Sequence, residues 1–434
     1  MYPSNIKFIV LQVGFKMAQR SKLLLFLLVV LLISLMVLWV PAIGYVNSEM
    51  VDFGEVDVTV YVVALDGVES REVNNVSRTV EGALHACNLS HCENNVTFTI
   101  DPGWGAFGGA VYGRIKMHVE TLVITTWELY KEVVETSRRT IIVNAHGETL
   151  PIPAGYTRNR WVDEIAESML NREVAWVHTA GYPFDYSWDQ GSGEILFGHE
   201  GFQRLMKHIR KSNITCDSPY YKRELWGITT HIGSHIAGFN WVALSNAFWV
   251  ELGNPLKASD FDEYSVLPLW GCEYYPGGIV KFASSNITTT FGFYIHIGTY
   301  GTYNSAQEST DSDYYRGYAG TAVALYFVTA RTVAEDTILK AEEAISESKG
   351  EGRTKGLEDA EDLLEKAWEQ FFKFDYIGRT SAITYADEAI QAAEVATEPS
   401  LFEAYGILMV LGFSGIAIIS TFAVRHKINS KKKK

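Results

Sequence analysis

Two long apolar segments, one near each end of the chain, constrain this sequence more than any other feature. Residues 23–40 read LLLFLLVVLLISLMVLWV, and residues 404–424 contain no charged side chain. A helix of about 20 apolar residues matches the roughly 30 Å hydrocarbon core of a bilayer, and it satisfies its own backbone hydrogen bonds there. The sequence therefore predicts a terminal transmembrane helix over residues 402–424, and a signal peptide or transmembrane anchor over residues 23–44.

Basic residues beside these segments predict the topology. Residues 1–22 carry a charge of +4, and the tail at residues 425–434 contains only basic charges. Since lysine and arginine mark the cytoplasmic side of a membrane, both flanks are predicted to be cytoplasmic and residues 45–400 to be exported. The small residues Ala42 and Gly44 also fit a cleavage site, so cleaved signal and retained anchor both remain open. The predicted location is the cell membrane, with the lipid bilayer as a partner.

The exported part is strongly acidic. The whole chain has a formal charge of −14, and the two terminal regions contribute +4 and +5, which leaves −23 for the remainder. Such a surface repels phosphate backbones, so the charge argues against a nucleic-acid partner.

All four cysteines and five glycosylation sequons lie in this exported region. An even number of cysteines in an oxidising compartment favours disulfides, with free buried cysteines as the alternative. Of the three possible pairings, Cys87–Cys92 with Cys216–Cys272 is preferred, because the first closes a short loop. Sequons of the form Asn-x-Ser/Thr predict a glycoprotein. They begin at Asn75, Asn88, Asn95, Asn213 and Asn286.

Residues 45–332 are predicted to form an α/β domain. Runs of strand length rich in β-branched residues occur at 56–65, 95–100, 140–145, 174–180, 266–270, 277–283 and 292–298. Helical patterns lie between several of them, at residues 121–136, 158–172, 202–211 and 315–333. Strands that alternate with helices of this length indicate βαβ units. The fold class predicted is a mostly parallel, flavodoxin-like sheet flanked by helices.

Residues 333–398 differ in composition and predict an acidic helical hairpin or stalk. They contain 17 acidic and seven basic residues. Apolar side chains recur at helical spacing, which is typical of amphipathic helices that pack on each other. The segment GEGRTKG at 350–356 predicts a turn between two helices.

Polar residues follow three of the predicted strands. His146 and His178 come at the ends of two of them, and His296 lies near the end of a third. Because the carboxyl ends of parallel strands meet at one edge of a sheet, where ligands bind, these side chains are expected to share a cleft. His146 and His178 are expected in one concavity, since a single helix joins their strands. The candidate cleft comprises Asn144, His146, Glu148, His178, Asp185 and His296.

Other candidate sites are weaker. Cys272 could act as a nucleophile with His146, but Cys216 would then be unpaired. His231 and His235 have the spacing of two metal ligands on a helix face, yet the glycines and threonines around them predict a poor helix. His199 and Glu200 precede a predicted helix and could add surface ligands. Neither a metal site nor a cofactor is predicted, and no catalytic residue can be named.

The strand that ends in His146-Gly147-Glu148, followed by a helix and a strand ending near Gly181, resembles the class I glutamine amidotransferase-like superfamily and its flavodoxin-like relatives. The resemblance covers residues 55–330 at most. Active members carry a nucleophilic cysteine in a G-x-C-x-G turn, where this chain has His178-Thr179-Ala180-Gly181. Caspase-like peptidases, which the His146-Gly147 pair also resembles, need a cysteine at the same place. A missing thiolate indicates a scaffold kept for binding or structure.

These observations predict a membrane-anchored, extracytoplasmic binding or structural protein, similar to archaeal envelope proteins. An envelope protein or a glycan is the expected ligand. The first alternative is an extracytoplasmic hydrolase on an amidotransferase-like or caspase-like scaffold, which would use the histidines and Glu148. The second is a scaffold subunit of a membrane complex. A nucleophile within reach of His146 would favour the hydrolase.

Overall fold

The computed structural model describes residues 51–71, 73–90, 93–100, 109–179, 183–198, 200–208, 221–225, 250–252, 256–257, 266–270, 274–275, 277–282, 291–297, 299–300, 310–373 and 381–399. Both apolar segments near the termini lie outside these ranges. No helix within the described ranges is long and apolar enough to cross a membrane. The signal or anchor segment and the terminal transmembrane helix therefore stay predictions.

An eight-stranded sheet forms the centre of the described part, in the order β12-β14-β15-β6-β4-β1-β3-β2. Its four middle strands are β15 (Gly292–Ile297), β6 (Ala175–His178), β4 (Thr140–Asn144) and β1 (Val51–Val63). Each is parallel to its neighbour in this group. The helix α4 (Arg158–Arg172) joins β4 to β6, as the sequence predicts. Its first turn is capped by Thr157, whose hydroxyl accepts a hydrogen bond from the backbone N–H of Arg160.

The flanks of this sheet correct the prediction of a mostly parallel fold, because the sheet is mixed. On one side, β14 (Gly277–Phe282) is antiparallel to both β15 and β12 (Val266–Trp270). On the other, β2 (Glu93–Ile100) is antiparallel to β3 (Gly109–Ile124). Parallel neighbours need a crossover of roughly a dozen residues or more. The connections between these outer strands are too short for one, so the chain returns as hairpins.

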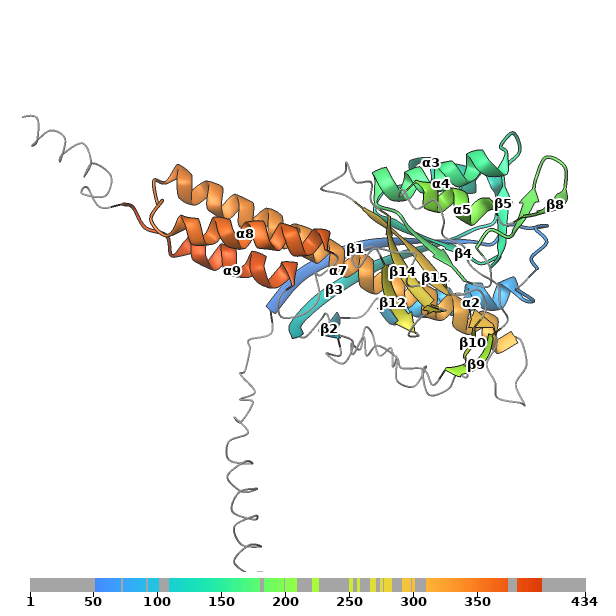
Figure 1. The fold of residues 1–434 in the computed structure, drawn as a ribbon, viewed down its shortest axis with the longest axis horizontal. Coiled ribbons are helices and arrows are strands. Elements are labelled where there is room, and N and C mark those ends of the chain that lie inside the picture. The colour runs from blue at the N-terminus through green and yellow to red at the C-terminus, as the bar shows by residue number, and fades with distance from the viewer. Residues whose placement is uncertain are drawn as a thin grey trace, which may run out of the picture. The chain divides into compact units, whose positions relative to one another are not determined.

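The sheet is covered by helices on both faces, which gives a roughly flavodoxin-like α/β arrangement (Figure 1). One face packs against α3 (Trp127–Thr136), α4 and α5 (Glu200–Lys207). The other packs against α2 (Val76–Ser90) and α7 (Thr310–Gly350). Successive side chains of a buried strand point to opposite faces of the sheet. Ile141 and Val143 therefore belong to the apolar cluster under α2 and α7, and Ile142 belongs to the cluster under α3, α4 and α5.

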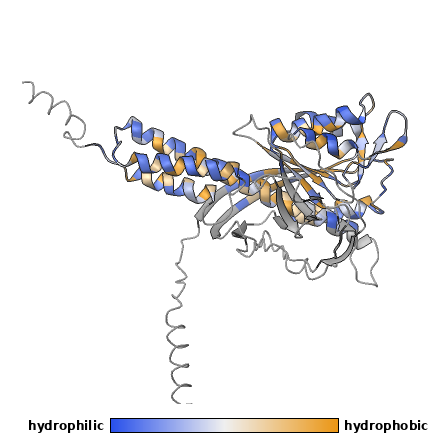
Figure 2. Ribbon diagram, in the orientation of Figure 1, coloured by the Kyte–Doolittle hydropathy of each residue, from blue (hydrophilic) through white to orange (hydrophobic). Residues whose placement is uncertain are grey.

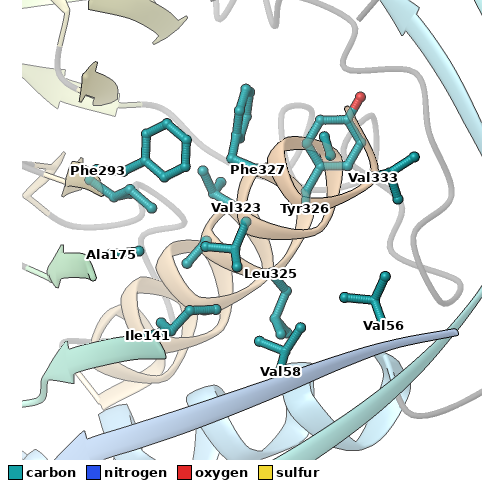
Figure 3. Packing of buried hydrophobic residues seen from close by; sticks show 14 of the residues in the cluster. Val56, Val58, Ile141, Ala175, Phe293, Val323, Leu325, Tyr326, Phe327 and Val333 are labelled. Carbon is teal, nitrogen blue, oxygen red and sulfur yellow. The ribbon is translucent and has the colours of Figure 1, made fainter. Parts of the chain in front are cut away.

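The long helix α7 fills one face of the sheet. Its residues Val323, Leu325 and Phe327 are fully buried. They lie among strand residues such as Ile141 and Phe293 (Figure 3). This stretch of α7 is apolar almost all round, which is typical of a helix enclosed by protein.

Two glycines let α2 and α7 approach closely. A Cβ atom placed on Gly82 would come within 1.9 Å of the carbonyl oxygen of Tyr314. One placed on Gly317 would come within 2.0 Å of the carbonyl oxygen of Thr79. Any side chain at either position would therefore push the helix backbones apart.

The C-terminal half of α7 continues beyond the sheet and packs with α8 (Leu357–Phe372) and α9 (Ala382–Glu394). The predicted boundary between residues 332 and 333 thus falls inside one continuous helix. The predicted turn at 350–356 is confirmed, since α7 ends at Gly350 and α8 begins at Leu357. Apolar and polar faces alternate along these helices in Figure 2. The buried stripe includes Ala360, Phe371, Ile383, Ala386 and Ala393.

One expected helix is only partly correct. The pattern at residues 121–136 predicts a single helix, but β3 extends to Ile124 and α3 begins at Trp127. The β-branched segment TLVIT favours an extended backbone, and pairing within the sheet decides the outcome.

A network of charged side chains lies at the opposite edge of the sheet from the predicted cleft. Arg331 of α7 is 1% exposed, and its Nη1 donates to the carbonyl oxygens of Glu173 and Phe291. Arg139 binds the carboxylates of Glu173 and Glu335 at 2.7 and 3.1 Å. These contacts join α7 to the amino-terminal ends of β4, β6 and β15.

Smaller sheets complete the described structure. The first has the order β5-β7-β8 and lies beyond the end of β4. Its strands are β5 (Thr149–Ile152), β7 (Tyr186–Asp189) and β8 (Glu194–Phe197). The others consist of β9 (Tyr221–Leu225), β10 (Val250–Leu252) and β16 (Thr299–Tyr300), and of β11 (Leu256–Lys257) and β13 (Tyr274–Tyr275).

Candidate functional site

Three of the predicted site residues form a row at the carboxyl ends of adjacent parallel strands. Asn144 of β4 pairs with His178 of β6, and His178 pairs with His296 of β15. All three are fully buried. Their positions alternate with those of Val143, Val177 and Ile295, so they belong to the face covered by α4 and α5. The prediction that strand ends gather these residues is correct for this row.

The two histidines in the row stack on each other. Their ring centroids are 5.5 Å apart and their planes differ by 3°. Tyr294 lies two residues before His296, on the same face of β15, and stacks on both histidine rings. Phe184 contacts His178 edge-on. Adjacent strands are about 4.8 Å apart, so planar side chains at paired positions come into contact naturally. The result is an aromatic cluster that excludes water from this edge of the sheet.

Asn144 holds the turn that follows β4. Its Nδ2 donates to the carbonyl oxygens of Gly147 and Thr149 at 3.0 and 3.1 Å. Its Oδ1 accepts from the backbone N–H of His146 at 3.2 Å. Gly147 has φ of 64°, a left-handed conformation that glycine adopts without strain. Asn144 therefore shapes the predicted site from within the fold.

His146 contacts the segment that follows β1. Its Nε2 accepts the backbone N–H of Leu65 at 2.9 Å, and its Nδ1 lies 2.9 Å from the hydroxyl oxygen of Ser70. Because Nε2 accepts, the neutral ring carries its proton on Nδ1, which donates to Ser70. Burial lowers the pKa of His146 to about 4. The imidazole is thus neutral near pH 7 with both nitrogens engaged.

The contacts of His146 and His178 extend in different directions. His146 bonds to residues that follow β1, whereas the rings stacked on His178 belong to β15. Glu148 and Asp185 are also buried, at 2% and 7% exposure. The backbone carbonyl of Asp185 accepts from Gly198 at 2.9 Å. The single concavity predicted for all six residues stays a prediction.

Thr179 directly follows His178 of this row. The hydroxyl of Thr179 donates to the carbonyl oxygen of Asn144 at 2.8 Å. Among the described residues, no group of three or more His, Cys, Asp or Glu side chains could hold a metal ion. Glu200 is exposed and pairs with Arg158 at 3.2 Å. His199, His231 and His235 lie outside the described ranges.

The sequence missed several residues that complete the cluster. Tyr294 is two positions before His296, so strand alternation alone could have placed it on the same face. Leu65 and Ser70 carry no comparable signal, because they lie 81 and 76 residues from His146. Phe184 follows residues 180–182, outside the described ranges, and has φ of 57°.

The described residues include only some of the cysteines and of the predicted glycosylation sites. Cys87 is buried in α2 and is unpaired among the described residues, and burial raises the pKa of its thiol to about 12. Its predicted partner Cys92, like Cys216 and Cys272, lies outside the described ranges, so the pairings stay predictions.

Among the predicted glycosylation sites, Asn88 is exposed. Asn75 is half-buried, and its Oδ1 accepts from the backbone N–H of Arg78. The Asn95 side chain, Asn213 and Asn286 lie outside the described set.

Comparisons with known proteins add no assignment. No family model, curated protein or solved structure matches the chain.

Proposed function

We propose that this protein is a membrane-anchored, extracytoplasmic binding or structural protein of the cell envelope, without catalytic activity. The observation that carries the non-catalytic part of this proposal is the engagement of both ring nitrogens of His146 within the fold. A general base needs a free lone pair directed at the proton that it removes. The backbone N–H of Leu65 occupies that lone pair.

The resemblance to the glutamine amidotransferase-like superfamily supports the same proposal. Enzymes of that class depend on a cysteine nucleophile, and this chain has Thr179-Ala180-Gly181 after the corresponding strand. The hydroxyl of Thr179 is engaged by a backbone carbonyl. The flavodoxin-like scaffold then serves to present surfaces to a ligand.

Sequence features support the location and the partners. The apolar segments at 23–40 and 404–424, with basic flanks, favour anchoring in the lipid bilayer. The acidic exterior and the sequons favour exposure outside the cell. An envelope protein or a glycan is the proposed ligand.

Protease treatment of intact cells tests the location. We expect external protease to digest residues 45–400 and a reporter fused after Lys434 to remain protected in the cytoplasm. Protection of residues 45–400 in intact cells, with digestion after lysis as the control, would overturn the proposed topology.

Mechanism-based probes test the absence of catalysis. We expect fluorophosphonate and acyloxymethyl ketone probes, which label serine and cysteine hydrolases, to leave the folded protein unmodified. Labelling that requires the folded state, and that His146→Ala abolishes, would establish a hydrolase instead. Labelling that persists after heat denaturation serves as the control for non-specific reaction.

A further inference from the structure

The segment that follows β1 lies against the turn after β4 before the chain enters α2. We call residues 65–71 the strap. Asp66, Gly67 and Glu69 of the strap are exposed, whereas Leu65 is only 3% exposed. The strap therefore has an anchored beginning and a middle that lies at the surface.

Hydrogen bonds join the strap to that turn and to the start of β5. The backbone N–H of Leu65 donates to Nε2 of His146, and Nδ1 of His146 donates to the hydroxyl of Ser70, each at 2.9 Å. The backbone N–H of Arg71 donates to the hydroxyl of Thr149 at 3.3 Å. Two of these bonds involve the same imidazole, so its protonation state controls both.

Both bonds to the imidazole need its neutral form. With its proton on Nδ1, the ring donates to Ser70 and accepts from Leu65. An imidazolium has a proton on each nitrogen and cannot accept, so the N–H of Leu65 would face a second donor. The neighbouring amide is different, because Ala64 donates to the carbonyl oxygen of Ile124 at 2.9 Å and neither group titrates. Protonation of His146 therefore loosens the chain from Leu65 onward and leaves the end of β1 in place.

We propose that the strap is an acid-released cover: protonation of His146 detaches residues 65–71 from the turn after β4 while the sheet stays folded. His146 and Thr149 are 1% and 0% exposed under the closed strap. Its release uncovers both at the carboxyl edge of β4, the edge at which sheets of this class bind ligands. The protein thus presents this edge to solvent at acidic pH. This inference goes beyond the proposed function and does not depend on where the protein is located.

The size of the effect follows from the pKa of His146 in the closed and open states. Burial lowers the pKa in the closed state to about 4, whereas a hydrated imidazole has its ordinary value of 6.5. Because the open state binds the proton more tightly, the opening equilibrium shifts by roughly 100-fold between pH 7 and pH 4. Burial of Leu65, and packing of Val68 against the same apolar cluster, oppose opening and keep the strap closed at neutral pH.

Other charged groups lie on the elements around His146. The strap carries Asp66, Glu69 and Arg71, which are exposed, and Glu69 pairs with Arg71 at 3.2 Å. Water and salt screen charges at such positions. The buried titratable groups of the same edge are Glu148 on the turn itself, His178 at the end of β6 and Asp185 before β7. Glu148 is only two residues from His146, so its effect must be separated from that of the imidazole.

Hydrogen exchange of single amides tests the release. In the full chain purified in detergent, we expect the protection factor of Leu65, which corrects for the pH dependence of intrinsic exchange, to fall roughly 100-fold between pH 7 and pH 4. At pH 4, low concentrations of urea should leave the exchange of Leu65 unchanged, because a local opening exposes little surface. The adjacent amide of Ala64 is the matched control, and it should stay better protected and respond to urea. Constant protection of Leu65, or identical protection and urea dependence of the two amides, would overturn the proposal.

Two variants identify the group that senses pH. The side-chain amide of His146→Gln can accept from Leu65 but does not titrate, so the fall in Leu65 protection should disappear. Glu148→Gln removes the neighbouring buried carboxylate and should retain the fall. Circular dichroism at pH 7 should show both variants folded, and the wild-type comparison of Leu65 with Ala64 tests the release without either variant. A fall that persists in His146→Gln, or vanishes in Glu148→Gln, would assign the response to another group and contradict the proposal.

Discussion

The backbone N–H of Leu65 donates a hydrogen bond of 2.9 Å to Nε2 of His146, across 81 residues of sequence. This contact joins the end of β1 to the turn after β4. It also gives a structural role to His146, which the hydrolase alternative would use in catalysis.

The first prediction concerns the pH dependence of stability. Burial lowers the pKa of His146 from 6.5 to about 4, so the unfolded chain binds this proton more readily than the folded protein does. The neutral side chain of His146 therefore contributes to the free energy of unfolding above about pH 6.5, and this contribution is lost as the pH falls toward about 4. At about 1.4 kcal/mol per pKa unit, the loss is about 3 kcal/mol.

Urea denaturation across this pH range measures the effect. The His146→Asn variant should show a flatter pH dependence than the wild type between these two values, because it has no imidazole to protonate. Parallel curves for the two proteins would contradict the assigned burial of His146.

The second prediction concerns Asn144. Asn144→Asp removes the Nδ2 donor and places a carboxylate against the carbonyl oxygens of Gly147 and Thr149. We expect it to destabilise the fold more than Asn144→Ala does, although aspartate is closer in shape. Loss of a buried hydrogen-bonded group costs about 1–3 kcal/mol, and a buried charge adds to this. Chemical denaturation at neutral pH compares the stabilities of the two variants. A less stable Asn144→Ala would contradict the hydrogen bonds assigned to Asn144.

The third prediction compares two glycines in helices. Gly82→Ala should destabilise the protein, because the added Cβ would meet the carbonyl oxygen of Tyr314 at 1.9 Å and force α2 from α7. Overpacking of this kind costs about 1–3 kcal/mol. Gly350→Ala has open space around its Cβ. Since alanine is the better helix former by up to about 1 kcal/mol, the variant should match or exceed wild-type stability. The thermal unfolding midpoint should therefore fall for Gly82→Ala and stay level or rise for Gly350→Ala, and equal shifts would refute the close contact.

The fourth prediction concerns the buried guanidinium at the other edge of the sheet. Arg331→Ala leaves the carbonyl oxygens of Glu173 and Phe291 without this donor. Leaving a buried acceptor unsatisfied costs about 1–3 kcal/mol for each group. Arg138→Ala removes an exposed partner of Glu173 and should cost at most about 1 kcal/mol. Denaturation midpoints of the two variants measure the difference, and similar losses would argue against the buried network.

The sequence by itself determined the local elements and part of the site. Apolar periodicity and β-branched runs predict β4, α4, β6, β15 and the helices of the hairpin, because these patterns depend on residues close together in the chain. The rule that parallel strand ends meet at one edge correctly gathers Asn144, His178 and His296. The membrane segments rest on the same kind of local evidence and stay predictions.

Only the tertiary structure decided which strands became neighbours and which atoms met across them. It made the flanks of the sheet antiparallel. It also formed the hydrogen bonds of His146 with Leu65 and Ser70, and the contact of Gly82 with Tyr314, which join segments far apart in sequence. Sequence patterns record whether a side chain is buried, since burial repeats with the period of the helix or strand. They do not record its partner, because that depends on the packing of the whole chain.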